Sequence, residues 1–291
     1  MNNYCYTIDM KKILVSSLVS FMSIILISPT VMAAKPTGGG TAANLLGIDV
    51  SYPQCGKLLP KTQAFGIVGV NGGLATTTNS CLKDQLIWAS KSVGGTLQDK
   101  IQLYVNTANP GGLNTASWPT GSLDPSGNTT TNPYDTCDGT DSIACAWQYG
   151  WNRAVQDVID RFIPAATQAE LDASPASYIW WLDVETVNTW KSPTSSFNTQ
   201  SNTAVLEGMT KYFKSVYGRV GLYSTAYQWG QIVGGSVSLT SNLNGLNNWR
   251  PGGASLSTAK QACTATPLTT NGKVILTQYV SKNLDYDYSC V

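Results

Sequence analysis

The sequence predicts an α/β fold, a (β/α)8 barrel of the TIM type in a single domain, with some helices irregular or missing. Short apolar runs alternate with segments of helical period from residue 45 to the end. Repeated alternation of this kind produces a parallel sheet, and a barrel is its expected closure at this length. An open doubly wound sheet is the alternative, but the chain has no Gly-x-Gly-x-x-Gly motif or phosphate-cradling loop.

Eight apolar segments are predicted to be strands because they are short, rich in β-branched and aromatic residues, and bounded by turn residues. In chain order they are 45–50, 65–70, 101–105, 178–182, 219–224, 247–249, 274–279 and 284–288.

Three segments carry apolar side chains at helical spacing: Leu82 to Val93, Trp147 to Phe162, and Val205 to Val216. Gly218 is placed to end the third helix. The polar stretch from Asn109 to Cys145 is too long for an ordinary loop, and after a strand it is expected to overhang the catalytic face of a barrel.

The first 33 residues are expected to be a secretory signal peptide. Lys11 and Lys12 precede an apolar stretch, and Val31-Met32-Ala33 fits a small-residue cleavage site. An uncleaved membrane anchor is the alternative. Residues 34–44, rich in Gly and Thr, are expected to form a flexible leader, and residues 45–291 the barrel domain. We therefore expect a secreted protein, extracellular or associated with a cell wall.

Cysteine usage agrees with export. Apart from Cys5, which would leave with the signal, the cysteines are Cys55, Cys81, Cys137, Cys145, Cys263 and Cys290. An even number in an exported chain predicts disulfides, although six cysteines allow about 15 connectivities. We expect nearest neighbours to pair, and no Cys-x-x-Cys motif favours a metal cluster.

Composition excludes several chemistries. The chain has no histidine, which removes Ser-His-Asp and Cys-His catalysis and imidazole zinc sites. A formal net charge of +1 gives no reason to expect nucleic-acid binding. Carboxylates remain as the catalytic groups, and no metal or cofactor is expected. Of the three glutamates, Glu170 falls in a polar stretch and Glu207 on a predicted helix surface, whereas Glu185 adjoins a strand.

Asp183-Val184-Glu185 is the most informative motif, because it ends the apolar run 178–182. Residues two apart in a strand share a face, so both carboxylates point the same way, with a backbone spacing of roughly 6.6 Å. Neighbouring buried acids raise the pKa of at least one member, as glycosidases require. Glycan cleavage is therefore the first hypothesis.

Five motifs in order give the chain a resemblance to family-25 glycoside hydrolases, the lysozyme-type muramidases. Gly47-Ile48-Asp49-Val50-Ser51-Tyr52-Pro53-Gln54 resembles the opening strand of that family, and Asp183-Val184-Glu185 its D-x-E strand. Val220-Gly221-Leu222-Tyr223-Ser224, Thr277-Gln278-Tyr279-Val280-Ser281 and Leu284-Asp285-Tyr286-Asp287 resemble three later strands.

The resemblance implies a hydrolase that cuts a β-1,4 bond in peptidoglycan or a related cell-wall glycan. It makes Glu185 the general acid and Asp49, Asp183 and Asp285 the surrounding carboxylates, with Asp183 orienting the substrate's acetamido group. Gln54, Tyr223, Gln278, Tyr279 and Asp287 would bind substrate, and Asp287 is an alternative to Asp285 as the closing carboxylate. We expect a monomer whose partner is the polysaccharide, with no nucleic acid and no membrane association after signal cleavage.

The chain also departs from the family pattern. Val70-Asn71-Gly72-Gly73 stands where a polar K-x-T-E-G-like segment usually follows the second strand of the family, and Tyr104-Val105-Asn106 lacks the usual histidine. A non-catalytic glycan-binding barrel is therefore the alternative. A chitinase-like enzyme is disfavoured because Trp181 occupies the position of its further aspartate. Trp118, Trp190, Trp229 and Trp249 either stack on sugars or pack internally.

Overall fold

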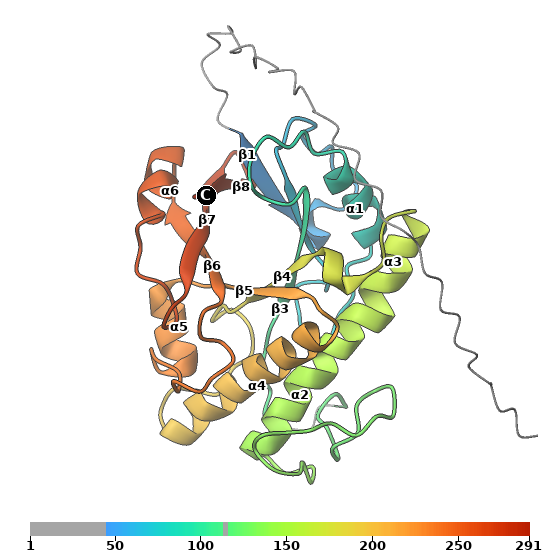
Figure 1. The fold of residues 1–291 in the computed structure, drawn as a ribbon, viewed down its shortest axis with the longest axis vertical. Helices are drawn as coiled ribbons and strands as arrows, with labels where there is room; N and C mark the ends of the chain where they lie inside the picture. The colour runs from blue at the N-terminus through green and yellow to red at the C-terminus, as the bar shows by residue number, and fades with distance from the viewer. Residues whose placement is uncertain (1–44, 113–115) are drawn as a thin grey trace, which may run out of the picture. The chain divides into compact units, whose positions relative to one another are not determined.

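The computed structural model describes residues 45–112 and 116–291, so the expected signal peptide and leader lie outside the described residues. Eight strands close into a barrel in sequence order, which confirms the predicted fold class (Figure 1). They are β1 (Leu46–Val50), β2 (Gly66–Gly69), β3 (Ile101–Asn106), β4 (Ile179–Asp183), β5 (Arg219–Tyr223), β6 (Asn247–Gly253), β7 (Lys273–Ser281) and β8 (Leu284–Ser289). Each predicted strand is present, with bounds shifted by a few residues.

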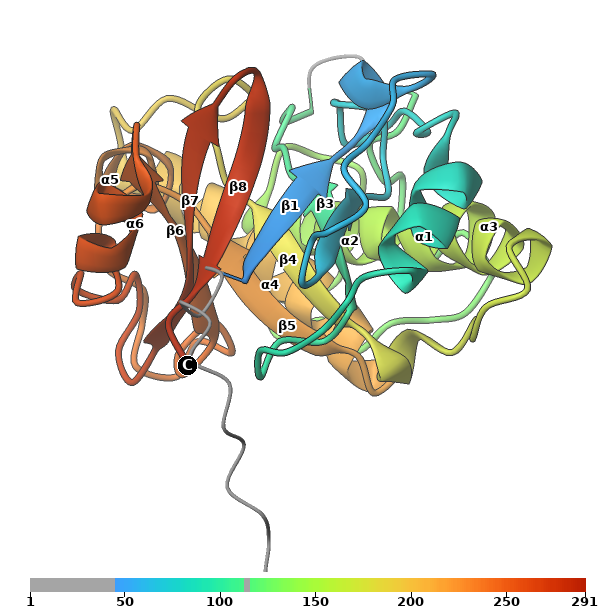
Figure 2. The same cartoon turned by 90° about the horizontal axis from the view of Figure 1, so that it is seen from above.

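The last two strands depart from a regular β/α barrel. β7 and β8 form an antiparallel hairpin, and β8 closes the barrel by antiparallel pairing with β1 (Figure 2). Lys282 and Asn283 connect them with φ values of 52° and 62°, the left-handed pair of a two-residue hairpin turn. Because β8 runs opposite to β1, its first residues lie at the carboxyl end of β1.

Helices cover the outside of the barrel between β2 and β7. They are α1 (Leu82–Ser90), α2 (Ile143–Gln156), the π-helical η2 (Asp157–Phe162), α3 (Ile163–Gln168), α4 (Ser196–Ser215), α5 (Ala226–Val233) and α6 (Leu256–Ala262), with 3-10 turns η1 (Tyr52–Gln54) and η3 (Pro175–Ser177). The predicted helices correspond to α1, α2 with η2, and α4. No helix among the described residues is long and apolar enough to cross a membrane.

The end of α4 differs from the prediction. Tyr217, not Gly218, takes the left-handed conformation there, with φ of 62°. The amide of Gly218 then donates to the carbonyl of Phe213 at 2.8 Å. An added Cβ at Gly218 would lie 3.0 Å from the Trp180 ring, so close packing under β4 is what favours glycine at this position.

Two apolar clusters form the core, one inside the barrel and one between the sheet and its helices. Trp181 lies in the interior cluster, where its indole N–H donates to Gln102 at 2.7 Å. Trp180 points outward and stacks on Phe213 of α4, with ring centroids 4.6 Å apart. The alternation along β4 thus buries both tryptophans, one in each layer.

All three expected disulfides are present: Cys55–Cys81, Cys137–Cys145 and Cys263–Cys290. They fasten the loop after β1 to the start of α1, the β3–α2 connection to α2, and α6 to the end of the chain.

Part of the connection from β3 to α2 does not lie where it was predicted to lie. Its later part lies outside the helical layer, where Trp118 stacks on Tyr149 of α2 and Tyr134 bonds Glu207 of α4 (Figure 1). The expectation that it overhangs the catalytic face is therefore wrong for these residues, because their apolar and hydroxyl groups find partners on α2 and α4.

Candidate active site

Three aspartates meet where β1 and β8 pair. Asp49 is directly opposite Asp285 in the ladder, and Asp287 is opposite Gly47. Residues two apart share a face, so Asp285 and Asp287 point into the barrel together with Asp49. Asp287 is fully buried, and neither of its carboxylate oxygens has a well-directed hydrogen-bond partner within the described part of the chain.

The other two acids end β4. Asp183 is the last residue of the strand and is buried, whereas Glu185 lies two residues beyond it and is half-buried. The backbone here is fixed on both sides: the Asp183 carbonyl accepts from the Thr107 hydroxyl at 2.6 Å, and the Glu185 carbonyl accepts from the Trp190 indole at 2.9 Å. Glu185 thus extends from a rigid strand end into the opening at the carboxyl ends of the parallel strands, which we call the barrel mouth.

A hydrogen-bonded chain joins β5, β7 and β1 across the barrel. The Tyr223 hydroxyl donates to Gln278 at 2.7 Å, and the Gln278 amide donates to Asp49 at 2.9 Å. Gln278 therefore has both ends of its amide engaged, which fixes its orientation and holds the Asp49 carboxylate in place.

Two of the expected substrate-binding residues have side chains that are engaged elsewhere. The Gln54 side chain accepts from the Ser51 amide at 3.0 Å and so caps η1. Tyr279 follows Gln278 on β7 and therefore points to the opposite face, where it stacks on Tyr286 at 5.4 Å. Tyr223, Gln278 and Asp287 do lie with the acids.

Burial dominates the electrostatics of the buried aspartates. It raises the pKa of Asp49 well above its usual range, and the charge of Asp285 adds to the rise. Burial raises the pKa of Asp183 likewise, with Glu185 and Asp49 adding to it. The pKa of Asp287 is also raised, first by burial and then by Asp49 and Asp285. Five carboxyl groups converging on one mouth cannot all ionise together, so the cluster retains protons.

Glu185 is itself held toward its protonated form. Burial raises its pKa first, the Gln228 side chain opposes this rise, and the charge of Asp285 adds to it. A raised pKa was expected, with an ionised Asp183 as its cause. Burial and the charge of Asp285 raise the pKa of Glu185, and the two acids at the end of β4 are coupled, because Glu185 also raises the pKa of Asp183.

Sequence reasoning missed Gln228 and Tyr104 as site residues. Gln228 lies in the first turn of α5, and its amide approaches the Glu185 carboxylate at 3.5 Å. Thr225 and Gln228 form a capping box, and this Thr-x-x-Gln spacing is a signal that would have located α5. Tyr104 of β3 lies inside the barrel, where burial and then Asp49 raise its pKa.

The positions that depart from the family pattern form an amide pair beside Asp183. Asn71 accepts from the Asn106 amide side chain at 2.8 Å and from its backbone N–H at 2.9 Å. Asn106 is the partner of Asp183 in the β3–β4 ladder. Neutral amides thus border Asp183 on the β3 side of β4.

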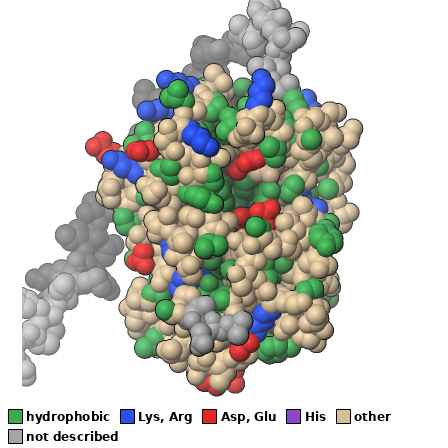
Figure 3. Space-filling model, turned by 180° about the vertical axis from the view of Figure 1, so that it is seen from behind, with side chains coloured by type: hydrophobic (Ala, Val, Ile, Leu, Met, Phe, Trp, Pro, Cys, Tyr) green, Lys and Arg blue, Asp and Glu red, His purple; other side chains and the backbone are tan. Residues whose placement is uncertain are grey.

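The tryptophans left open by the sequence pack internally in large part. Trp118, Trp229 and Trp249 are buried, and Trp190 is half-buried with its indole bonded to Glu185. On the space-filling surface, acidic side chains lie on either side of a hollow near the middle of one face, bordered by apolar side chains (Figure 3). A polar ligand that enters this hollow can contact the carboxyl groups, and apolar side chains surround it.

Comparison with known proteins adds a family match. The family model described as lysozyme-like protein 1 matches residues 164–258, a segment that contains Asp183, Glu185 and Gln228. Over this segment the chain is similar to that family. The match confirms the resemblance to lysozyme-type proteins expected from the motifs.

The chain also aligns with a solved structure, a family GH25 lysozyme from Aspergillus fumigatus. The two chains share 13% sequence identity, and the alignment covers 84% of this chain and 93% of the other, with a TM-score of 0.44. None of the curated proteins compared with the chain matches it.

Proposed function

We propose that this protein is a secreted glycoside hydrolase that cleaves a β-1,4 bond in peptidoglycan or a related cell-wall glycan by carboxylate acid/base catalysis. The observation that carries the proposal is the position of Glu185: a half-buried carboxyl group with a raised pKa, at the barrel mouth beside the fully buried Asp183. A carboxyl group that keeps its proton at mildly acidic pH is the group that glycosidic oxygen needs as a general acid.

Glu185 donates its proton to the leaving oxygen, and the substrate's own acetamido oxygen closes on the anomeric carbon. Asp183 orients the acetamido N–H and balances the positive charge that develops on this group. The mutual influence of the two acids suits these roles, since a protonated Glu185 removes the charge that opposes ionisation of Asp183. Water, activated by the Glu185 carboxylate, then opens the cyclic intermediate and restores the acid.

Asp49, Asp285 and Asp287 line the opposite side of the mouth. Asp49 is held by Gln278, and Asp285 sets part of the charge that Glu185 experiences. The three disulfides support export, because such bonds persist in oxidising compartments.

Substitution of Glu185 by Gln tests the proposal. The amide keeps the shape of the side chain but cannot transfer a proton, so we expect hydrolysis of a peptidoglycan suspension, followed by loss of turbidity, to fall by about 10²- to 10⁴-fold. The exposed Glu170, substituted in the same way, is the matched control and should behave as wild type. Wild-type rates in Glu185→Gln would rule out this assignment.

The second candidate is a non-catalytic barrel that binds cell-wall glycan. The observation that favours it is the neutral amide pair Asn71–Asn106 beside Asp183, because both residues lie in segments that depart from the family pattern. Sedimentation of the protein with insoluble peptidoglycan, without any release of reducing ends, would support this alternative over hydrolysis.

A further inference from the structure

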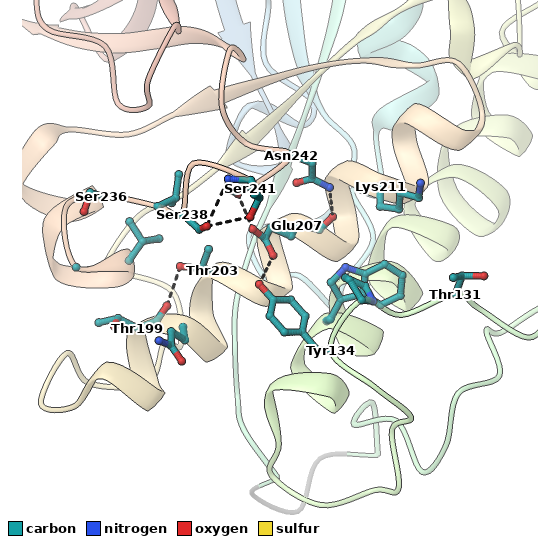
Figure 4. Close-up of a pocket in the computed structure, with 17 residues that line it drawn as sticks. Thr131, Tyr134, Thr199, Thr203, Glu207, Lys211, Ser236, Ser238, Ser241 and Asn242 are labelled. Carbon is teal, nitrogen blue, oxygen red and sulfur yellow. Dashed lines mark hydrogen bonds between the residues drawn. The ribbon is translucent and has the colours of Figure 1, made fainter.

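A second cavity lies on the outer side of the helical layer. It is a groove of about 1000 Å³ that crosses α4, with the segment 131–134 as one wall and the segment 233–242 as the other (Figure 4). None of the five acids of the barrel mouth lines it. We refer to it as the α4 groove.

Glu207 lies at the centre of the α4 groove. The sequence places this residue on a helix surface, but its exposed fraction is only 7%. Its two carboxylate oxygens accept from the hydroxyls of Tyr134 and Ser241, each at 2.5 Å, one from each wall (Figure 4). A carboxylate accepts about four hydrogen bonds, so this one retains acceptor capacity for a ligand's hydroxyl groups.

Both walls are held in place without a ligand. Asn132 donates to the Ala144 carbonyl of α2 at 2.7 Å, and the Cys137–Cys145 disulfide fastens the same wall. On the other side, Asn242 donates to the Glu207 carbonyl at 2.9 Å and accepts from Lys214 at 3.1 Å. A groove that is already formed costs little ordering free energy on binding, as is usual for ligand sites.

The lining indicates the class of ligand. Its polar groups are mainly neutral hydroxyls and amides, among them Thr199, Thr203, Ser236, Ser238 and Gln200. Hydroxyls both donate and accept, which matches the hydroxyls of a sugar. Glu207 repels anions, and Lys211 is the one cation of this lining, so a phosphate chain or an acidic polymer finds no matching charge. Val233, Val237 and Pro133 supply apolar surface for the faces of sugar rings.

We propose that the α4 groove is a second glycan-binding site, which takes a neutral oligosaccharide stretch independently of the acids at the barrel mouth. Such a site keeps the protein on a long polysaccharide while the mouth engages another part of the chain or a neighbouring chain. The effective concentration of glycan near the mouth then rises without any new contact there.

The test measures binding of the β-1,4-linked hexamer of N-acetylglucosamine by titration calorimetry, in Glu185→Gln protein so that the probe is not cut. The groove variant is Gln200→Ala with Lys211→Ala, two exposed positions of the lining. Gln261→Ala on α6, exposed and outside the groove, is the matched control. Ser236→Leu, at another exposed position of the lining, places an apolar side chain there as a second, independent variant.

We expect one class of binding sites to weaken by roughly tenfold or to disappear in both groove variants, as expected for the loss of one or two hydrogen bonds, and to persist in Gln261→Ala. This result would support glycan binding in the α4 groove even if the wild-type protein had no hydrolase activity. The experiment therefore tests the groove separately from the proposed hydrolysis. Unchanged stoichiometry and affinity in both groove variants, no binding of the hexamer at all, or preference for an oligogalacturonate over the neutral hexamer would each overturn the inference.

Discussion

Among single residues, Glu185 and Asp285 show that carboxyl groups from distant parts of the chain act on one another. Asp285 comes from the last strand and Glu185 from the end of β4, far apart in sequence, yet the charge of Asp285 raises the pKa of Glu185. The pKa of Asp183, two residues away from Glu185, is raised as well, first by burial and then by Glu185 and Asp49. Proximity along the chain therefore does not identify every carboxylate that acts on Glu185.

Replacing Asp285 by Asn should move the falling limb of the kcat/KM profile to lower pH. Removing the anion lowers the pKa of Glu185, so this acid loses its proton earlier as pH rises. Asp183→Asn should also move the falling limb to lower pH, because the two acids are coupled, and it should in addition reduce kcat by about 10²-fold or more. A falling limb that moves only in Asp183→Asn would show that the strand neighbour, not Asp285, sets this pKa.

Among elements, the strands of the barrel depend on glycine opposite large aromatic residues. A Cβ at Gly221 of β5 would lie 2.2 Å from the Trp181 ring, and one at Gly47 of β1 would lie 2.0 Å from Phe65. These pairs alternate small and large side chains so that the interior fills without overlap. The acids at the barrel mouth follow these packed residues along the strands. The packing of the barrel interior therefore helps to position the acids.

Gly221→Ala is expected to lower the free energy of unfolding by about 1 to 3 kcal/mol, because the Trp181 ring must shift within a full interior. Gly230 of α5 has open space around an added Cβ, so Gly230→Ala should be neutral or stabilise by about 0.5 to 1 kcal/mol. Urea unfolding of both variants measures the difference. Equal stabilities would mean that the interior accommodates the extra methyl.

The disulfides are predicted to differ in strength with the length of chain they close. Cys263–Cys290 spans 27 residues and Cys137–Cys145 spans 8. Loss of chain entropy in the unfolded state gives roughly 3.5 and 2.5 kcal/mol respectively. Replacing each pair by serines and measuring thermal unfolding should therefore show the larger loss for Cys263–Cys290. The reverse order would mean that the β3–α2 connection stabilises the fold in other ways.

At the scale of the whole molecule, the buried acids link stability to pH. Asp49, Asp183 and Asp287 have raised pKa values in the folded protein, so the folded state binds more protons than the unfolded chain above about pH 4. Stability contributed by these groups is therefore present at low pH and is lost as pH rises through the folded-state pKa values.

We expect the melting temperature to decrease from mildly acidic toward neutral pH, and Asp287→Asn to flatten this decrease and raise the melting temperature at neutral pH. Asp84→Asn, at an exposed position of α1, is the control and should leave the slope unchanged. A steeper slope in Asp287→Asn would show that Asp287 is ionised and stabilised in the folded protein.

The sequence by itself determined the eight strands, the presence of disulfides among six cysteines and the motif that carries Asp183 and Glu185, because strand period, residue type and local spacing are properties of neighbouring residues. The pairing of nearest neighbours agrees with the structure, but the sequence left about 15 connectivities open. The tertiary structure decided what depends on distant segments. It turned β8 antiparallel, which brings Asp285 opposite Asp49, and it buried Glu207 between two loops. It also moved Tyr279 away from the acids and made burial the main cause of the raised pKa of Glu185. The burial of a side chain and the charges near it depend on every segment that packs around it in the folded protein. A local sequence pattern does not specify which distant segments these are.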